Sequence, residues 1–355
     1  MSELSLDEAP SARTPVRVLQ SINAPSGPTE YSSQLEFGRA AETTNVYFSW
    51  PRALFGRVDV FHAHWPEYWI RNSQPVKAAL QKVLFPLMLV RFRLTGVPIV
   101  RTLHNLTPHE RGGRLEALLL ALFDRWTTLS IRLNRATEVP AGRSYVTILH
   151  GHYVDRFADL PRPAVTPGRV LYFGHIRPYK GVDTLIDAFR ALEGDDHSLR
   201  IVGKPKGDEL PALIGAAEVA DPRIGSRLEF VDDDVMVAEV GASALVVLPY
   251  REMHNSGALL VALSLGRPAL VPRSPANEAL AAETGDGWVL QYDGELTADI
   301  LRKALTDVAN RDPAALPNLD GRGWAVMGER HYRAYLLAGE LEQARRRRRR
   351  RKGGA

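Results

Sequence analysis

The stretch that decides the fold, residues 171–189, reads LYFGHIRPYKGVDTLIDAF. Its apolar start predicts a buried strand that ends at Gly174, and a helix is expected to begin at Gly181. The short loop between them carries two basic residues, Arg177 and Lys180. Backbone N–H groups at a helix start and two nearby cations favour an anion, and a diphosphate would suit them. The alternative is an exposed loop whose basic residues are incidental.

A second stretch, residues 246–272, reads VVLPYREMHNSGALLVALSLGRPALVP. A strand runs into a polar loop, and a helix is expected to begin near Asn255 and Ser256, two residue types that cap helix N-termini well. Gly257 would let a ligand approach the backbone closely. The alternative is that Asn255 and Ser256 only cap the helix and bind no ligand. Two helix starts suited to anions in one half of the chain favour a ligand site instead.

Strand and helix patterns alternate along the whole chain. Strands are expected at 16–19, 58–62, 97–103, 145–149, 169–173, 199–202, 228–231, 244–248 and 268–271. Helices are expected at 30–42, 74–95, 113–132, 181–192, 256–265 and 276–283. This alternation is typical of parallel sheets built from βαβ units. We therefore expect an α/β fold of two doubly wound, Rossmann-like domains facing a central cleft, with ligands beyond the carboxyl ends of the strands.

The domain boundaries are expected where the composition changes. Residues 159–168 contain three prolines and one glycine, which predicts a linker between compact units. The amino-terminal domain is then 1–158, and the carboxy-terminal domain is 169–322. A last helix is expected over 323–344, followed by a basic, disordered tail at 345–355.

The composition excludes several classes of protein. A chain of 355 residues with 45% hydrophobic and 24% charged residues is expected to be globular, with about two domains. The absence of cysteine excludes disulfides, thiolate metal sites and a cysteine nucleophile. No stretch approaches the roughly 20 apolar residues of a membrane span, and the acidic, polar start MSELSLDEAP is unlike a signal peptide. These features predict a cytoplasmic protein.

The net charge of +4 conceals an uneven distribution. Residues 345–352 supply eight positive charges, and without them 37 basic and 41 acidic residues remain, a net charge of −4. A block of like charges is most often solvated and attracts anionic partners. We expect an anionic membrane surface as that partner. Nucleic acid is the alternative, but the acidic body contains no recognised nucleic-acid module, so no specific binding of this kind is expected.

A second feature also favours a membrane surface. Residues 76–94 mix leucines and phenylalanines with four basic residues, as interfacial helices do. A core-facing helix kinked at Pro86 is the alternative interpretation. Together with the arginine run, this segment would supply the two signals that weak peripheral attachment usually takes.

The two motif-bearing stretches resemble the donor domain of GT-B glycosyltransferases, which use nucleotide sugars. The resemblance rests on FGHIRPYKGVDTLIDAF at 173–189 and on PYREMHNSGA at 249–258 with the GRP that follows, and it covers about 170–290. The first half agrees through DVFHAHWPE at 59–67 and VRTLHNLTPHE at 100–110. The chain most closely resembles the xanthan-type mannosyltransferases that extend lipid-linked glycans from GDP-mannose.

The resemblance implies a hexosyltransferase that moves mannose from GDP-mannose to a lipid-linked saccharide in polysaccharide or glycolipid assembly. Such an enzyme would work as a peripheral protein on the inner face of the cell membrane. Arg177 and Lys180 would hold the donor diphosphate beside Gly174, supported by the helix start at 255–257. No cofactor and no metal ion are implied. The alternatives are the same fold with UDP-glucose or UDP-glucuronate, or a non-catalytic protein that binds polyanions or membranes through its arginines.

One position departs from the pattern of the large retaining GT-B families, which carry two glutamates eight positions apart in the second stretch. Glu252 lies near the first place, but Val261 occupies the second. Valine cannot accept hydrogen bonds from a sugar or a ribose, so the departure favours inverting, β-forming transfer. Glu278 is then a candidate for ribose recognition.

The first half places polar residues where its expected strands end. His62, His64, Trp65 and Glu67 close or follow the strand at 58–62. A second group follows another strand, and the carboxyl ends of parallel strands share one edge of a sheet, so both groups are expected to face the cleft. In the resembling family this half would hold the acceptor, and His64 and Trp65 are the residues expected to bind it.

The second group consists of His104, His109 and Glu110. An inverting transfer needs a base within hydrogen-bond reach of the acceptor hydroxyl. Glu110 and Glu67 are the candidate bases, and His104 is a third catalytic candidate that would contact the sugar or phosphate. His109 is expected to bind the acceptor. The alternatives are structural histidines, or a metal site made by the histidines of both groups, because rings two residues apart on a strand share a face.

Overall fold

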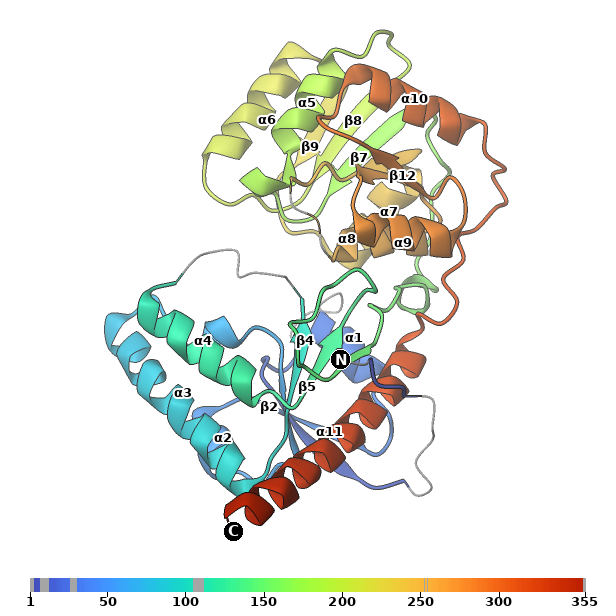
Figure 1. Cartoon of the computed structure of the whole chain (residues 1–355). Coiled ribbons are helices and arrows are strands. Elements are labelled where there is room, and N and C mark those ends of the chain that lie inside the picture. The colour runs from blue at the N-terminus through green and yellow to red at the C-terminus, as the bar shows by residue number, and fades with distance from the viewer. Residues whose placement is uncertain are drawn as a thin grey trace. The chain divides into compact units, whose positions relative to one another are not determined.

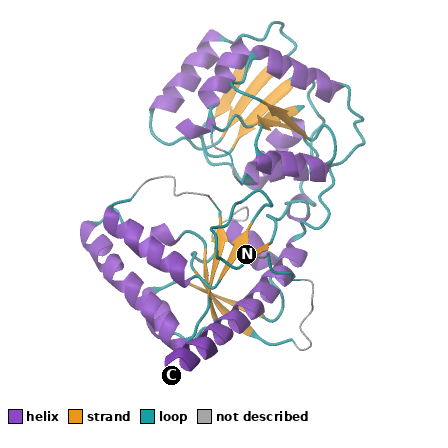
Figure 2. Cartoon of the chain, viewed as in Figure 1, coloured by secondary structure: helices purple, strands orange, loops and turns teal. Residues whose placement is uncertain are grey.

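The computed structural model describes residues 3–6, 13–25, 31–104, 112–251, 253 and 255–353. The chain forms two compact units: Met1–Gly151 with Arg322–Ala355, and His152–Gly321. Each unit contains one six-stranded parallel sheet, and Figure 2 shows helices on both faces of each sheet. The expected α/β fold with two doubly wound domains is confirmed.

The first unit has the strand order β2-β1-β3-β4-β5-β6. Its strands are β1 Val16–Gln20, β2 Thr43–Tyr47, β3 Val60–Ala63, β4 Ile99–Leu103, β5 Leu129–Arg132 and β6 Tyr145–Thr147. Its helices are α1 Tyr31–Phe37, α2 Trp50–Phe55, α3 Pro75–Thr95, α4 Arg114–Trp126 and α11 Trp324–Gly353, with a 3₁₀ helix at Pro66–Trp69.

Successive strand residues in this sheet enter two different cores. Val18 and Val60 pack in one cluster with α1 and α11, whereas their neighbours Leu19 and Phe61 pack in another with α3 and α4. Side chains alternate across a strand, so strands covered on both faces are apolar at consecutive positions. Figure 1 shows α3 and α4 on one side of this sheet and α11 on the other.

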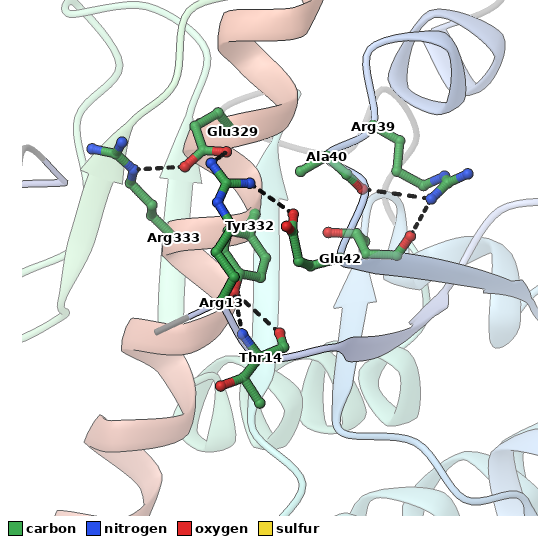
Figure 3. Close-up of polar contacts among 9 residues, drawn as sticks. Arg13, Thr14, Arg39, Ala40, Glu42, Glu329, Tyr332 and Arg333 are labelled. Atoms are coloured by element: carbon green, nitrogen blue, oxygen red, sulfur yellow. Dashed lines mark hydrogen bonds and ion pairs between the residues drawn. The ribbon is translucent and has the colours of Figure 1, made fainter. Parts of the chain in front are cut away.

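The amino-terminal segment ties α11 into the first unit, as Figure 3 shows. Thr14 N donates to Tyr332 OH at 2.8 Å, and the same hydroxyl donates to Thr14 O at 3.1 Å. Arg13 forms ion pairs with Glu42 at 2.8 Å and with Glu329 at 3.4 Å. The contacts of Thr14 with Tyr332 and of Arg13 with Glu329 join residues more than 300 positions apart in the sequence.

The arginine run corrects the prediction of a disordered tail, because the helix expected to end at 344 continues to Gly353. Arg345 donates to Thr127 O at 3.2 Å and Thr128 O at 3.5 Å, just beyond the end of α4. Arg346 donates to Leu94 O at 2.8 Å and Thr95 O at 3.0 Å, at the end of α3. The last carbonyls of a helix have no partner within it, and arginine is well suited to satisfy them.

The second unit has the strand order β12-β11-β10-β7-β8-β9. Its strands are β7 Arg169–Phe173, β8 Ser198–Val202, β9 Ile224–Arg227, β10 Leu245–Val247, β11 Ala269–Pro272 and β12 Val289–Tyr292. Its helices are α5 Val182–Arg190, α6 Glu209–Ala220, α7 Asp233–Ala242, α8 Gly257–Ser264, α9 Pro275–Thr284 and α10 Ala298–Ala309, with 3₁₀ helices at Asp155–Phe157 and Pro178–Lys180. The expected strand at 228–231 is wrong, because the strand is β9.

The unit boundaries also differ from the expected ones. The second unit begins at His152, so the proline-rich stretch at 159–168 belongs to it. It ends at Gly321, and the last helix returns to the first unit. In that stretch, Thr166 N donates to Ala242 O at 2.9 Å, which attaches the segment to the end of α7.

Each sheet has one point where the strand order reverses. In the first sheet β1 lies between β2 and β3, and in the second β7 lies between β8 and β10. The loops that follow two neighbouring strands at such a point leave in opposite directions, which opens a crevice where α/β proteins bind ligands. The reversals lie at β1/β3 and at β7/β10.

Candidate active site

The two motif-bearing stretches follow β7 and β10, the pair of strands at the reversal in the second sheet. Gly181 packs so tightly on the carbonyl oxygen of Pro249 that a Cβ there would overlap it. Arg251 reinforces the contact, because its N–H donates to Tyr179 O at 2.8 Å and its side chain pairs with Asp183. The loops after β7 and β10 therefore form one structure.

Lys180 is held at the centre of this structure by a tyrosine. Its Nζ lies 3.1 Å from Tyr250 OH and 4.5 Å from the centre of the Tyr250 ring. The buried Tyr250 hydroxyl is also hydrogen-bonded to the side chain of Ser256. Ser256 caps α8, where its Oγ accepts from Leu259 N at 3.2 Å. Tyr250 therefore contacts both Lys180 and the N-terminal residue Ser256 that caps α8.

The electrostatics of the loop after β7 are strongly positive. Burial, with the nearby charge of Arg177, lowers the pKa of Lys180 to about 8. Burial also lowers the pKa of His175, and Arg177, Lys180 and Lys204 lower it further. Within the part of the chain that the structure describes, neither Arg177 nor Lys180 pairs with a carboxylate. An anion would relieve this repulsion.

Two glycines shape the backbone of the loops after β7 and β8. Gly174 has φ 105°, which favours glycine, and among the residues that the structure describes no atom beyond its chain neighbours lies within 4 Å of the place where its Cβ would be. Gly203, after β8, has φ 146°, and a Cβ there would overlap the carbonyl oxygen of Gly174. Arg177 lies along the same loops, where its guanidinium donates to Ile176 O at 3.0 Å and to Lys204 O at 3.4 Å.

The other predicted residues of the second unit are placed as follows. Gly257 is the first residue of α8 and Asn255 lies two positions before it, both half-buried. Glu278 is in the first turn of α9, within the helix expected at 276–283, and its Oε1 accepts from Arg273 at 3.3 Å. Val261 is buried in α8.

The first unit gathers histidines at the reversal between β1 and β3. His64 Nε2 lies 3.1 Å from Gln20 Oε1, at the end of β1, and His64 Nδ1 lies 3.0 Å from His104 Nε2, after β4. Trp65 stacks on His104 with ring centres 4.0 Å apart. Glu67 is buried in the 3₁₀ helix after β3. His64, Trp65 and His104, taken from the two groups that follow β3 and β4, therefore lie in one cluster.

The predicted residues Glu252, His109 and Glu110 lie outside the described residues. Sequence reasoning also missed several members of the histidine cluster: Gln20, Tyr31, His150, Trp324, His331 and Tyr335. Tyr31 touches His64, His104, His150 and Trp324 edge-on. Nothing local in the sequence points to Trp324, His331 and Tyr335, because they lie on α11, at the other end of the chain. Tyr250 was within a quoted motif but had no assigned role.

Burial keeps this histidine cluster uncharged. It lowers the pKa of His64 to about 3 and those of His150 and His331 to about 4, and it holds the pKa values of His62 and His104 well below the ordinary value. Neighbouring histidines lower the pKa of His104 further. Neutral imidazoles can each donate and accept one hydrogen bond, so the cluster is suited to polar recognition and proton transfer.

Comparison with known proteins decides the family. The family model described as glycosyl transferases group 1 matches residues 167–307. The GDP-mannose:glycolipid 4-beta-D-mannosyltransferase of Xanthomonas campestris pv. campestris is 44% identical over 326 residues, which cover 91% of this chain and 93% of the relative. The chain belongs to the glycosyltransferase family.

Solved structures confirm the GT-B fold of this glycosyltransferase. Anabaena HepE in complex with UDP has a TM-score of 0.62 at 12% identity, covering 93% of this chain and 98% of that one. Sucrose-phosphate synthase from Thermosynechococcus elongatus has a TM-score of 0.55 at 15% identity, covering 97% and 100%. The predicted fold and enzyme class are therefore confirmed.

Proposed function

We propose that this glycosyltransferase transfers mannose from GDP-mannose to a lipid-linked saccharide and forms a β linkage. The name of the Xanthomonas relative, similar over nearly the whole of both chains, supports this choice of donor and acceptor. The observation that carries the donor half is the meeting of Lys180, Tyr250 and Ser256 at the strand reversal. A cationic loop joined to a helix N-terminus is suited to a diphosphate.

Each donor-site residue then has a defined role. Arg177 and Lys180 neutralise the charge that develops on the departing diphosphate, an electrostatic contribution that the folded loop has already organised. Ser256 and Gly257 begin α8, whose first N–H groups point towards the same charge. Gly174 has no side chain, so a phosphate can approach the backbone there.

The sugar and ribose contacts come from neighbouring segments. Asn255 precedes the α8 cap, and Glu278 is half exposed at the start of α9, where its carboxylate can accept bonds from ribose hydroxyls. Met253 Sδ lies 3.5 Å from Asn277 Nδ2, which joins the loop after β10 to α9. Val261, buried within α8, offers no carboxylate to a sugar or ribose, and this residue type favours an inverting reaction.

The acceptor half belongs to the first unit. The histidine cluster at β1/β3 offers Trp65 as a stacking surface for a sugar ring, with His64 and His104 as polar partners. Glu67, Glu110 and His104 are the proposed bases, and His109 completes the acceptor contacts. Cations of the protein neutralise the leaving group, so we propose that transfer needs no metal ion or other cofactor.

The donor test is a panel of radiolabelled GDP-mannose, UDP-glucose and UDP-glucuronate, each incubated with the enzyme and a membrane lipid extract. Label should enter the lipid fraction only from GDP-mannose and should be released by β-mannosidase. Lys180→Met should lower turnover about 100- to 1,000-fold, the range seen when one charge-stabilising donor is lost. Lys303→Met, on the exposed face of α10, is the matched control. Label from a UDP sugar, or full activity of Lys180→Met, would overturn the proposal.

We also propose that the enzyme acts as a peripheral protein on the inner face of the cell membrane, docked on anionic lipid through α3. Six apolar residues of α3 are between 42% and 83% exposed, and we call them the apolar stripe: Val76, Leu80, Val83, Leu87, Val90 and Leu94. They recur at intervals of four and three positions, so they lie on one helix face. The core-facing residues Phe85, Met88, Leu89 and Phe92 occupy the other face. Among the described residues, no helix is long and apolar enough to cross a bilayer.

Basic residues adjoin the end of the apolar stripe. Arg346 is bonded to the carbonyl of Leu94, the last member of the stripe, and the arginines at 347–351 that follow it are exposed, so we expect them to lie near this end of the stripe. A cavity of about 30 Å³ at this end is lined by Arg93, Arg125 and Arg349, among others. Each such charge contributes about 1 kcal/mol near an anionic leaflet. We therefore expect insertion of the apolar stripe into the bilayer and attraction of lipid phosphates by the arginines to act together at the carboxy-terminal end of α3.

Vesicle flotation tests the membrane proposal. Leu80→Asp with Leu87→Asp should abolish flotation with vesicles containing phosphatidylglycerol, because a charge replaces each inserted leucine. Val219→Asp is the matched control, because Val219 is 90% exposed on α6 in the other unit. Binding that survives the stripe variant, or equal binding to neutral vesicles, would contradict the docking surface.

A further inference from the structure

The cavity of about 30 Å³ in the first unit lies where the ends of α3 and α4 meet the last turns of α11. Figure 1 shows those turns of α11 beside the end of α3. The buried side chains of Leu89 and Ile99 line the cavity from the core. We call it the arginine cavity, because four of its lining residues are arginines: Arg93, Arg125, Arg345 and Arg349.

The arginine cavity carries an excess of positive charge. Glu342 is the carboxylate that lines it, so four cations and one anion leave a net charge of +3 (four minus one). Glu342 is already engaged, because its carboxylate accepts from Thr128 Oγ1 at 3.4 Å and lies 4.0 Å from Arg345. In the part of the chain that the structure describes, the other three arginines pair with no carboxylate.

These three arginines can be reached from solvent. Arg93, Arg125 and Arg349 are all exposed, and the guanidinium group of Arg93 lies over the Trp126 ring, 5.2 Å from its centre. Arg345, bonded to the carbonyls just beyond α4, fixes the position of the last turns of α11. Arg349 follows Arg345 by four positions, so both lie on the same face of that helix.

The arginines of the cavity repel one another. Burial and the charges of Arg349 and Arg125 lower the pKa of Arg93, and only Glu342 opposes this shift. Burial also lowers the pKa of Arg345, and Arg349 and Arg93 lower it further. Arginine stays protonated in proteins, so the cluster cannot relieve this repulsion by losing a proton. A bound anion relieves it.

The size of the cavity and its donors favour a terminal phosphate. A volume of about 30 Å³ has room for two or three groups of water size, at about 10–15 Å³ each, which suits the oxygens of one phosphate. A guanidinium group presents paired N–H donors that match two phosphate oxygens. A terminal phosphate offers three such oxygens and a charge of about −1.5 to −2 at pH 7. A phosphodiester offers two oxygens and a charge of about −1, so it matches the excess charge less well.

We propose that the arginine cavity binds a terminal phosphate group through Arg93, Arg125 and Arg349, and that this group belongs to a lipid headgroup or to a soluble phosphate monoester. The inference goes beyond the proposed function, because phosphate binding at this site requires neither sugar transfer nor a membrane. Only its lipid form rests on the proposed docking through the apolar stripe.

The place of the cavity suits a lipid headgroup in particular. Arg93 is next in the chain to Leu94, the last member of the apolar stripe, so an inserted stripe would bring the cavity to the level of the headgroups. The cavity and the histidine cluster are at opposite ends of β4. Ile99 lines the cavity at the start of that strand, and Leu103 ends it about 13 Å further along, at about 3.3 Å per residue. A phosphate held here would anchor the first unit without occupying the acceptor residues.

Titration calorimetry of the full chain with glycerol 3-phosphate tests the site without a membrane. Arg93→Gln with Arg125→Gln should raise the dissociation constant at least about tenfold, because two charged hydrogen-bond donors are lost. Arg348→Gln with Arg350→Gln is the matched control. It removes the same charge from exposed arginines of the run that do not line the cavity, and it should change the dissociation constant less than about twofold. Phosphate bound by the loops after β7 and β10 contributes equally in all three proteins. Thermal unfolding in phosphate-free buffer checks that each variant is folded.

Vesicle flotation identifies the source of the phosphate. Vesicles contain phosphatidic acid, which has a terminal phosphate, or phosphatidylglycerol, a phosphodiester, each diluted in phosphatidylcholine to the same surface potential. A preference for phosphatidic acid that Arg93→Gln with Arg125→Gln abolishes assigns the site to a lipid headgroup. The control pair should weaken binding to both kinds of vesicle alike and keep the preference.

The remaining outcomes are equally decisive. Binding of glycerol 3-phosphate that depends on Arg93 and Arg125, without any preference between vesicles, assigns the site to a soluble phosphate monoester. If neither readout depends on these two arginines, the inference is overturned. Leu80→Asp with Leu87→Asp should bind glycerol 3-phosphate as the wild type does, so failure of membrane docking is distinguishable from failure of this site.

Discussion

The pKa of Lys180 predicts a specific pH dependence for donor binding. With a pKa of about 8, Lys180 is about nine-tenths charged at pH 7 and about one-tenth charged at pH 9. Only the charged form attracts the diphosphate, so the dissociation constant for GDP should rise about tenfold between these two pH values. Isothermal titration calorimetry at pH 7, 8 and 9 measures it.

Two variants separate the lysine from other titrating groups. Lys180→Arg keeps its charge throughout this range, and Lys180→Met has none, so both should lack the tenfold change and differ only in overall affinity. Any ionisation of the nucleotide itself appears equally in all three proteins. A dissociation constant for the wild type that parallels that of Lys180→Met from pH 7 to 9 would refute the reasoning.

Three further predictions concern stability. The buried histidines have lowered pKa values, so below about pH 6.5 the unfolded chain binds more protons than the folded chain. The free energy of unfolding should therefore fall between about pH 6.5 and pH 4, and at pH 5 the loss should be up to about 2 kcal/mol per histidine. Urea unfolding at pH 7.5 and at pH 5 measures this loss. Gly203→Ala should cost about 2 kcal/mol or more by thermal unfolding, because its Cβ would strike Gly174, whereas Gly215→Ala in the open interior of α6 should stabilise by up to about 1 kcal/mol. Arg346→Ala should lower the free energy of unfolding by about 1 kcal/mol, because the carbonyls at the end of α3 lose their hydrogen-bond donor. Arg350→Ala should leave the free energy of unfolding almost unchanged, because Arg350 is exposed.

The arrangement of the loop after β7 was predictable from sequence because its parts are neighbours in the chain. Strand, cations and helix start all lie within residues 171–189, so their order alone places Arg177 and Lys180 beside a helix N-terminus. The contact of Tyr250 with Lys180 was not predictable from sequence, because it joins residues 70 positions apart. Pairing of β7 with β10 creates that contact, and only the sheet order reveals the pairing.

The histidine cluster was predictable only in part. His64 and His104 end neighbouring parallel strands, which local patterns indicate, but His331 and Tyr335 arrive on α11, far along the chain. The edge strand β9, of sequence IGSR, was missed because a strand with one neighbour need not be apolar throughout. The arginine run suggested a solvated tail because like charges repel, whereas carbonyls at the ends of α3 and α4 bind two of its members.

A crystal structure of the enzyme soaked with GDP tests the central claim most directly. The account predicts the β-phosphate within hydrogen-bond distance of Lys180 Nζ and of the first N–H groups of α8, with Tyr250 still beneath the lysine. Phosphates bound elsewhere, with Lys180 left on Tyr250 and no nucleotide between the loops after β7 and β10, would contradict it.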